Sequence, residues 1–178
     1  MSINSRNYKI IPYDKKWPIL FSREAKIINK IIGNNILETH HIGSTAVPGM
    51  FGKETIDILF VVEDISKIDA HILDLKKIGY VSLGLRNAEN TYLFEKEIDG
   101  ERLFIIHFYP KNHPEIFQII AIRDYLRTHP DKVKEYSEAK LSFFQKFPND
   151  YSQYRQLKDG YMKNLKTKAL IWAKSERV

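Results

Sequence analysis

The sequence contains no cysteine. A disulfide framework, a zinc site built from thiolates and a cysteine nucleophile are therefore excluded. A chain that forms no disulfides gains nothing from an oxidising compartment, so we expect the protein to work in the cytoplasm.

Long apolar runs are also missing, as is any stretch dominated by glycine, proline or serine. No run approaches the ~18 apolar residues that a membrane span needs, and the N-terminus MSINSRNYKIIPYDKKW lacks a basic segment followed by an apolar one. We therefore expect no membrane partner. Because no segment has the composition of a linker and 43% of the 178 residues are hydrophobic, the sequence predicts a single domain, residues 1–178, with its own core.

Acidic residues are outnumbered by basic ones, 22 to 28, and the excess is uneven. From Lys132 onward the chain reads KVKEYSEAKLSFFQKF and then YRQLKDGYMKNLKTKALIWAK. A basic, tyrosine-rich segment of this kind is compatible with a surface that meets a polyanion, so nucleic acid is a possible partner of the C-terminal helices. A solvated helix face is the more typical role, because aspartates and glutamates are interspersed among the lysines.

Apolar periodicity predicts an α+β fold. Helical spacing covers residues 18–32, 65–78, 115–127, 131–147 and 150–174. Strand-like runs cover residues 36–42, 56–62, 80–83, 91–98 and 102–109, and the last two are joined by the hairpin signal Asp99-Gly100. These elements predict a mixed sheet of about four or five strands flanked by helices, with residues 1–112 as the α/β core and the C-terminal helices of residues 113–178 packing on it.

Gly43-Ser44 and Asp57 are the first candidates for chemistry. A glycine and a small serine directly after a strand let the chain turn sharply, with backbone N–H groups and a hydroxyl facing an anion such as a triphosphate. By itself the pair is more typical of a simple turn. Asp57 favours the phosphate-binding interpretation over the simple turn. It lies within the apolar strand over 56–62, where an ionised carboxylate needs a partner or a cation.

A strand carboxylate opposite a Gly-Ser turn resembles the arrangement of the nucleotidyltransferase superfamily, to which polymerase beta belongs. The segment HIGSTAVPG followed by K-x-x-IDI resembles the signature of the GrpB family, small proteins assigned to that superfamily. The segments IIPYDKKWP and IAIRDYLRTHPDKVKEYSEAK extend the resemblance over nearly the whole chain. It implies a nucleotidyltransferase-like fold and metal-dependent transfer of a nucleotidyl group from a nucleoside triphosphate to an unknown acceptor.

The resemblance also implies roles for individual residues. Gly43 and Ser44 would form the phosphate-facing turn, with His41 entering it and Lys53 leaving it. Asp57 would be the carboxylate that holds Mg²⁺ or Mn²⁺. We therefore expect a nucleoside triphosphate and a divalent cation as partners of this loop and strand.

The sequence departs from the active polymerase-like pattern at two points. That pattern places two acids one residue apart on the strand, whereas the neighbours of Asp57 on the same strand face are Thr55 and Leu59. A third acid from a later strand is not evident, and the corresponding strand LFIIHFY offers His107 instead. Because a neutral imidazole binds a transition metal or acts as a base near neutral pH, Asp57 and His107 are the candidate catalytic residues. The alternative for His107 is a hydrogen-bonded core residue.

Other titratable residues leave alternatives open. His40 and His41 point to opposite faces of their strand, so only one of them can join Asp57 and His107. Such a set of three would form a facial triad, as in a metal-dependent hydrolase.

Arg123 is a further phosphate-binding candidate, because it lies in the RDYLR segment of the family resemblance and a guanidinium matches phosphate oxygens bidentately. Arg127 and Lys140 are weaker candidates of the same kind. The alternative is structural: Arg123 and Asp124 pair with partners on the sheet and fasten the helices.

Three functions are therefore compatible with the sequence. The first is nucleotidyl transfer, the second a nucleotide-, RNA- or protein-binding module that has lost transfer activity, and the third a hydrolase that uses His and Asp as metal ligands. The missing second carboxylate distinguishes the second function from the first, because metal-assisted transfer usually uses more than one carboxylate ligand.

Overall fold

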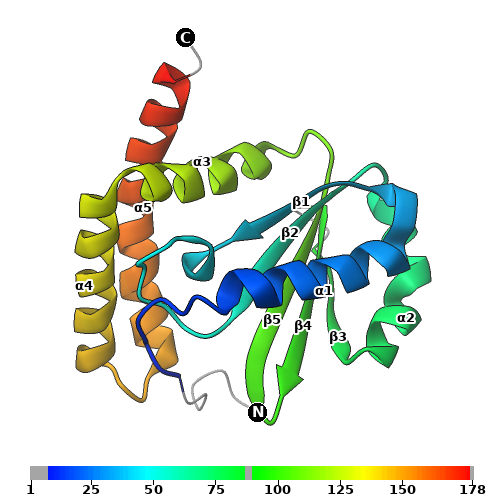
Figure 1. Ribbon diagram of the computed structural model, residues 1–178, viewed down its shortest axis with the longest axis horizontal. Helices are drawn as coiled ribbons and strands as arrows, with labels where there is room; N and C mark the ends of the chain where they lie inside the picture. Colours follow the sequence, from blue (N-terminus) through cyan, green and yellow to red (C-terminus); the bar gives the residue numbers. More distant parts are fainter. Residues whose placement is uncertain (1–7, 87–89, 177–178) are drawn as a thin grey trace. The chain divides into compact units, whose positions relative to one another are not determined.

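The computed structural model describes residues 8–86 and 90–176, which form two compact units (Figure 1). The sheet unit comprises Asp14–Ala46 and Thr55–Ile116. The helical unit comprises the described residues up to Tyr13, the segment Val47–Glu54 and the described residues from Phe117 onward. The segment Val47–Glu54, which connects two strands of the sheet unit, therefore belongs to the helical unit. No change in amino-acid composition along the sequence indicates this division. Each unit is described by itself.

The sheet unit contains a mixed sheet of five strands, which confirms the prediction. The strands are β1 (Ile36–Ile42), β2 (Ile56–Val62), β3 (Tyr80–Arg86), β4 (Thr91–Ile98) and β5 (Glu101–Pro110). Their order across the sheet is β1-β2-β5-β4-β3, and β2 and β5 pair in parallel while the other neighbours are antiparallel. Strand β3 runs three residues beyond the predicted 80–83, because a register shift between Ser82 and Leu85 interrupts the alternation on which the prediction relied.

Helical segments cover one face of this sheet. Helix α1 (Trp17–Ile32) buries Ala25, Ile28 and Ile32 at helical spacing. The predicted single helix over 65–78 is wrong in its first half. It consists of the 3₁₀ segment η4 (Ile65–His71) followed by the short helix α2 (Ile72–Lys77). The sequence did not separate the two, because an apolar spacing of three residues suits the 3.0-residue period of a 3₁₀ helix as well as an α-helix.

Residues that pair across neighbouring strands point to the same face, so the register assigns every strand residue to one of two faces. The covered face carries fully buried apolar side chains such as Ile58, Phe94 and Ile106, which lie in one row across β2, β5 and β4. The other face carries Asp57, which pairs with Ile105 of β5, and it is called the Asp57 face below.

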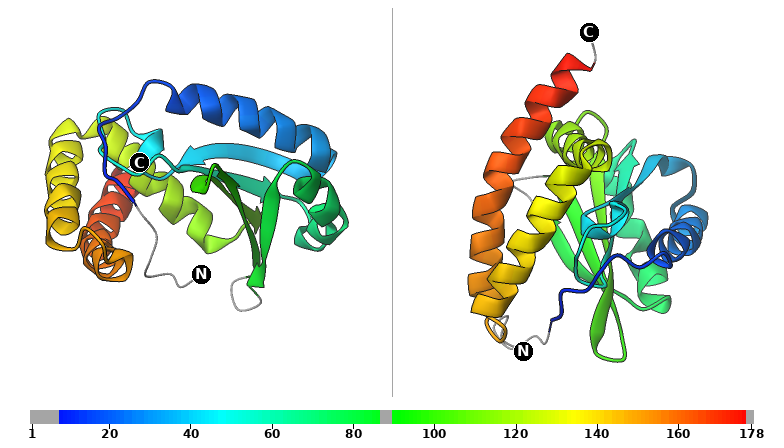
Figure 2. Two further views of the ribbon diagram at one scale, coloured as in Figure 1. Left: turned by 90° about the horizontal axis from the view of Figure 1, so that it is seen from below. Right: turned by 60° about the vertical axis from the view of Figure 1, so that its left-hand side comes forward.

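Three helices dominate the helical unit, within two residues of the predicted ranges. They are α3 (Pro114–Thr128, whose first residues still belong to the sheet unit), α4 (Pro130–Lys146) and α5 (Tyr151–Ser175). Helices α4 and α5 run side by side in opposite directions (Figures 1 and 2). Their core includes Tyr136, Leu165 and Ala169. No helix among the described residues combines the length and the apolar character that crossing a membrane requires. The packing of the C-terminal helices on the α/β core stays a prediction.

Candidate functional site

The Gly43–Ala46 turn follows β1 directly and lies against Asp57. Gly43 has φ +73°, and the backbone N–H of Ala46 donates to the Gly43 carbonyl over 3.3 Å. A Cβ placed on Gly43 would lie 2.7 Å from Oδ2 of Asp57, closer than side-chain carbons pack. The position therefore needs glycine for two reasons: its positive φ and the close approach of the carboxylate. The turn and the strand acid, 14 positions apart in sequence, are in contact.

A buried hydrogen-bond network fixes this turn to the strands. The Thr45 hydroxyl donates to the Thr55 carbonyl over 3.4 Å, and the Thr55 hydroxyl donates to the Arg102 carbonyl of β5 over 3.0 Å. His41 Nε2 lies 3.0 Å from Thr45 Oγ1. His41 and the Thr45 side chain thus share a buried hydrogen bond. The network therefore links β1, the turn, the start of β2 and β5.

Asp57 and His107 face each other across the parallel pair of strands β2 and β5. His107 Nε2 lies 3.5 Å from Asp57 Oδ1, and the two side chains are 25% and 28% exposed. Both groups are therefore partly shielded and still reachable by a ligand. The structure brings together the two residues that the sequence analysis identified as catalytic candidates, in contact with the turn that it identified as phosphate-binding.

Glu95 is a residue that the sequence analysis missed. Glu95 of β4 and Asp57 of β2 both pair with Ile105 of β5, the strand between them. The two carboxylates therefore flank Ile105 on the Asp57 face. Glu95 forms an ion pair with Arg102. The hairpin at Asp99-Gly100 by itself would pair Glu95 with Phe104, and a register shift between Lys96 and Glu97 moves it opposite Ile105. Neither this shift nor the parallel register that aligns Asp57 with Ile105 can be read from the sequence.

The two histidines of β1 are separated by the sheet. His40 pairs with Leu59 and shares the Asp57 face, where its Nε2 lies 2.7 Å from Glu38 Oε2. His41 lies on the covered face, buried and stacked on Phe21 of α1 with ring centroids 4.7 Å apart. The structure therefore does not bring His41 to the side of Asp57, and His41 contacts the turn through Thr45.

No group of three or more His, Asp or Glu side chains in residues 8–86 and 90–176 is placed to hold a metal ion. The facial triad considered from the sequence is thus not formed by the described residues. Asp57 and His107 are a pair, and a cation held there needs most of its ligands from a bound molecule.

Lys53 belongs to the helical unit, where it contacts α5. Its Nζ donates to the Tyr151 hydroxyl over 2.8 Å and lies 4.3 Å from the centre of the Tyr151 ring. Its neighbours in the segment are also fastened within that unit: Gly52 exchanges two backbone hydrogen bonds of 2.9 Å with Ile11, and the Phe51 N–H donates to Ser137 Oγ over 3.1 Å.

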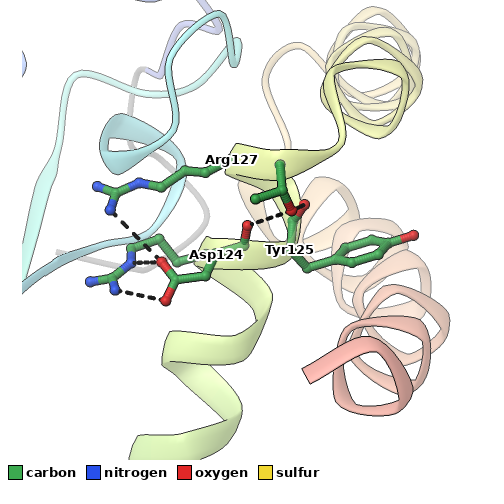
Figure 3. Close-up of polar contacts among 5 residues, drawn as sticks. Asp124, Tyr125 and Arg127 are labelled. Carbon is green, nitrogen blue, oxygen red and sulfur yellow. Dashed lines mark hydrogen bonds and ion pairs between the residues drawn. The ribbon is translucent and has the colours of Figure 1, made fainter. Parts of the chain in front are cut away.

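Arg123 also belongs to the helical unit, and its guanidinium forms an ion pair with the carboxylate of Asp124. Figure 3 shows Asp124 with Arg127 beside it. The Nε and one terminal nitrogen of Arg123 donate to the two oxygens of Asp124 over 2.7 and 3.0 Å. Arg127 lies 3.8 Å from the same carboxylate. Burial and the nearby Arg123 charge together lower the pKa of Arg127. Two guanidinium groups therefore share one carboxylate. Arg123 pairs with Asp124 of its own helix, whereas the structural alternative in the sequence analysis gave both residues partners on the sheet.

Lys140 is a buried cation in the same unit. It is 1% exposed, its Nζ donates to the Phe51 carbonyl and it lies 4.5 Å from the centre of the Tyr136 ring. Burial, with a smaller contribution from Lys158, lowers the pKa of Lys140 to about 7. Lys140 of α4 thereby helps to fasten the segment Val47–Glu54, which follows the Gly43–Ala46 turn in the chain.

Comparison with known proteins gives matches along nearly the whole chain. A family model described as GrpB protein matches residues 7–168. The chain is 33% identical over 169 residues to the UPF0157 protein YqkA of Bacillus subtilis, a match that covers 95% of this chain and 49% of YqkA. It is 33% identical over 161 residues to the UPF0157 protein BH1888 of Halalkalibacterium halodurans, covering 90% of this chain and 81% of that protein.

A solved structure is similar over almost its full length. The crystal structure of the conserved protein GrpB from Enterococcus faecalis matches with a TM-score of 0.88 and 31% sequence identity, covering 93% of this chain and 99% of that chain. The chain thus spans about half the length of YqkA and nearly all of the Enterococcus protein.

Proposed function

The chain belongs to the GrpB family, and from the geometry of its Asp57 face we propose that it binds a nucleoside triphosphate with a divalent cation and transfers the nucleotidyl group to an acceptor. Such a site needs a backbone turn for the phosphates and a carboxylate beside it for the cation. Both features lie within the sheet unit.

The observation that carries this proposal is the contact between Gly43 and Asp57. A residue with positive φ followed by a helical turn points successive backbone N–H groups into one concavity, which favours an anion. Gly43 has that conformation, and the 3₁₀ turn η3 (Ser44–Ala46) follows it. A carboxylate alone at such a concavity would repel a phosphate, so the Asp57 charge beside the turn fits a cation that bridges the two.

The residues present suit Mg²⁺ or Mn²⁺ bound together with a substrate. Mg²⁺ is commonly held by one or two carboxylates and by substrate phosphates rather than by an all-protein cage. Asp57 supplies one carboxylate, and the imidazole of His107 suits Mn²⁺ better than Mg²⁺. The cation would neutralise charge on the triphosphate, and Asp57 would hold it on the Asp57 face.

In nucleotidyl transfer, the acceptor oxygen forms a bond to the α-phosphorus while the bond from that phosphorus to pyrophosphate breaks. The acceptor hydroxyl must lose a proton during this step. His107 would take it at Nε2: an imidazole is a base near neutral pH, and this nitrogen lies 3.5 Å from Asp57 Oδ1, which supports the proposed role.

The first test measures nucleotide binding by calorimetry on wild type and Asp57→Asn. Each of the ribonucleoside triphosphates is titrated with and without Mg²⁺ or Mn²⁺. We expect wild type to bind only with the cation, and Asp57→Asn to lose affinity by at least about tenfold, or 1.4 kcal/mol. Asp74→Asn is the matched control, because Asp74 forms an exposed ion pair with Lys77 in the same unit. Equal affinity of Asp57→Asn and wild type would remove Asp57 from the site.

A binding module without transfer activity is the second candidate, and it is favoured by the lack of a third metal-ligating side chain among the described residues. Release of pyrophosphate separates the two functions. Wild type that binds nucleotide but releases none with any acceptor tested, and whose behaviour His107→Ala does not change, would be a binding module. Release that falls in His107→Ala while nucleotide affinity is kept supports transfer.

A further inference from the structure

Helix α5 concentrates positive charge on one side. It contains six basic residues and one acidic residue. At 3.6 residues per turn, four of the basic residues lie within roughly 100° of one another around the helix axis. These four define the basic face of α5: Arg155, Lys163, Lys166 and Lys174.

The basic face lies beside the side of α5 that packs in the core of the helical unit. That core side carries Leu165 and Ala169. The single acidic residue, Asp159, lies 3.5 Å from Arg155 and 3.6 Å from Lys158. No carboxylate of the described residues lies within ion-pair distance of the three lysines of the basic face.

Uncompensated charge of this kind is unfavourable for the free helix. Lys163 and Lys166 are three residues apart, a spacing at which like charges repel. The helix dipole favours a cation only near the C-terminus, so it accounts for Lys174 and not for the others. A bound polyanion would relieve the repulsion.

A shallow groove that is largely open to solvent lies along the same side of α5. Its lining residues are Ser152, Arg155, Gln156, Asp159, Gly160 and Lys163. Gly160 is exposed in the middle of the helix, and a Cβ placed there would meet nothing within 4 Å. Packing therefore does not require glycine at this position, although glycine is less favourable than alanine in a helix by about 1 kcal/mol. Because Gly160 has no side chain, the backbone of a ligand can approach the helix closely in the groove.

We propose that the basic face of α5 and its groove bind RNA through the ribose-phosphate backbone. Arg155 and Lys163 are suited to phosphates. Ser152, Gln156 and Asp159 can hydrogen-bond a ribose 2′-hydroxyl, and the Asp159 carboxylate is an acceptor for which a DNA backbone offers no donor. The groove contains no aromatic side chain on which bases stack, so binding is independent of sequence. This inference goes beyond the proposed nucleotide site and does not depend on it.

The test is fluorescence anisotropy of the full chain with a labelled single-stranded RNA of mixed sequence, at salt concentrations between about 50 and 200 mM. The variant Lys163→Gln/Lys174→Gln removes two cations of the basic face. The control Lys134→Gln/Lys168→Gln removes two exposed lysines, one on α4 and one on another side of α5, with the same change in net charge. Thermal melts check that both variants fold.

We expect the basic-face variant to lose roughly tenfold in affinity at the lower salt concentration and its salt slope to fall by about 1.4, because each phosphate contact on a single strand contributes about 0.7. The control should stay close to wild type. Equal losses in the two variants, or wild-type affinity in the basic-face variant, would overturn the proposal. Binding of the matching DNA as tightly as RNA would overturn the role of the 2′-hydroxyl.

Gly160→Ala tests the groove separately. Alanine should stabilise α5 by up to about 1 kcal/mol, which raises the melting temperature by roughly 2–4 °C. The added methyl group should at the same time weaken RNA binding severalfold, since it fills the floor of the groove. Stabilisation without any loss of RNA affinity would exclude the groove as the contact surface.

Discussion

Gly43→Ala should destabilise the chain by about 2–4 kcal/mol and at the same time displace the carboxylate of Asp57. Positive φ at position 43 strains any residue with a Cβ. The Cβ would in addition lie 2.7 Å from Asp57 Oδ2, so the carboxylate has to move, whereas the Cβ and Cγ of Asp57, at 3.4 Å, are at the edge of ordinary contact. Chemical denaturation measures the loss of stability, and calorimetry with nucleotide and cation measures the loss of the site.

Gly100→Ala is the matched control for this substitution. Gly100 has φ +79°, close to the value at Gly43, and a Cβ placed there would meet nothing within 4 Å. It should therefore suffer only the conformational strain, about 1–2 kcal/mol, and keep nucleotide affinity. The difference between the two variants isolates the contact with Asp57. If both lose the same amount of stability and both keep nucleotide affinity, Gly43 serves the turn alone.

Lys140→Met should change the pH dependence of stability more than any surface substitution. The pKa of Lys140 is about 7 in the folded chain, against 10.5 for an ordinary lysine. Between these values the unfolded chain binds more protons at this position than the folded one. The free energy of unfolding of wild type therefore rises with pH across this window, by up to about 1.4 kcal/mol per pH unit near its centre. Below pH 7 both states are protonated and the contribution is constant.

Methionine keeps the length of the side chain and does not titrate. It removes the buried charge, which is favourable at low pH, and it leaves the Phe51 carbonyl without its Lys140 donor, which costs about 1–3 kcal/mol at every pH. The free energy of unfolding of the variant, compared with that of wild type at the same pH, should thus be highest near pH 6. This difference should fall as the pH rises towards about 9.5.

Urea denaturation over that pH range measures the effect, with Lys134→Met, an exposed lysine of the same helix, as the control. The control should follow the wild-type profile. Parallel profiles for Lys140→Met and wild type would show that Lys140 titrates in the folded chain as it does in the unfolded one.

Much of the secondary structure was predictable, and the reason is local. Strands β1, β2 and β4 begin and end at the predicted residues, because turn residues or charged residues bound each of them. The misassigned segment Ile65–His71 has an apolar spacing that fits two helix types, and its contacts decide between them: Ile68 is fully buried, and Asp69 accepts a hydrogen bond from Tyr92.

The candidate site was predictable in part. Gly43 could be identified because a glycine directly after a strand allows a sharp turn. Asp57 could be identified because a carboxylate inside an apolar strand is energetically unfavourable without a partner. Their contact, and that of Asp57 with His107, depends on the pairing of β1 with β2 and on the parallel register of β2 with β5. The face occupied by each histidine of β1 depends on the same register.

The sequence by itself thus determined the elements, the family signature and the two residue types at the centre of the site, because propensity, turn chemistry and the cost of a buried charge act over a few neighbouring residues. Only the tertiary structure decided that Lys53 and Arg123 belong to the helical unit, that His41 supports the turn from the covered face, and that Glu95 flanks Ile105 opposite Asp57. These facts depend on strand register and on which segments pack together, and both are set by contacts between residues far apart in the chain.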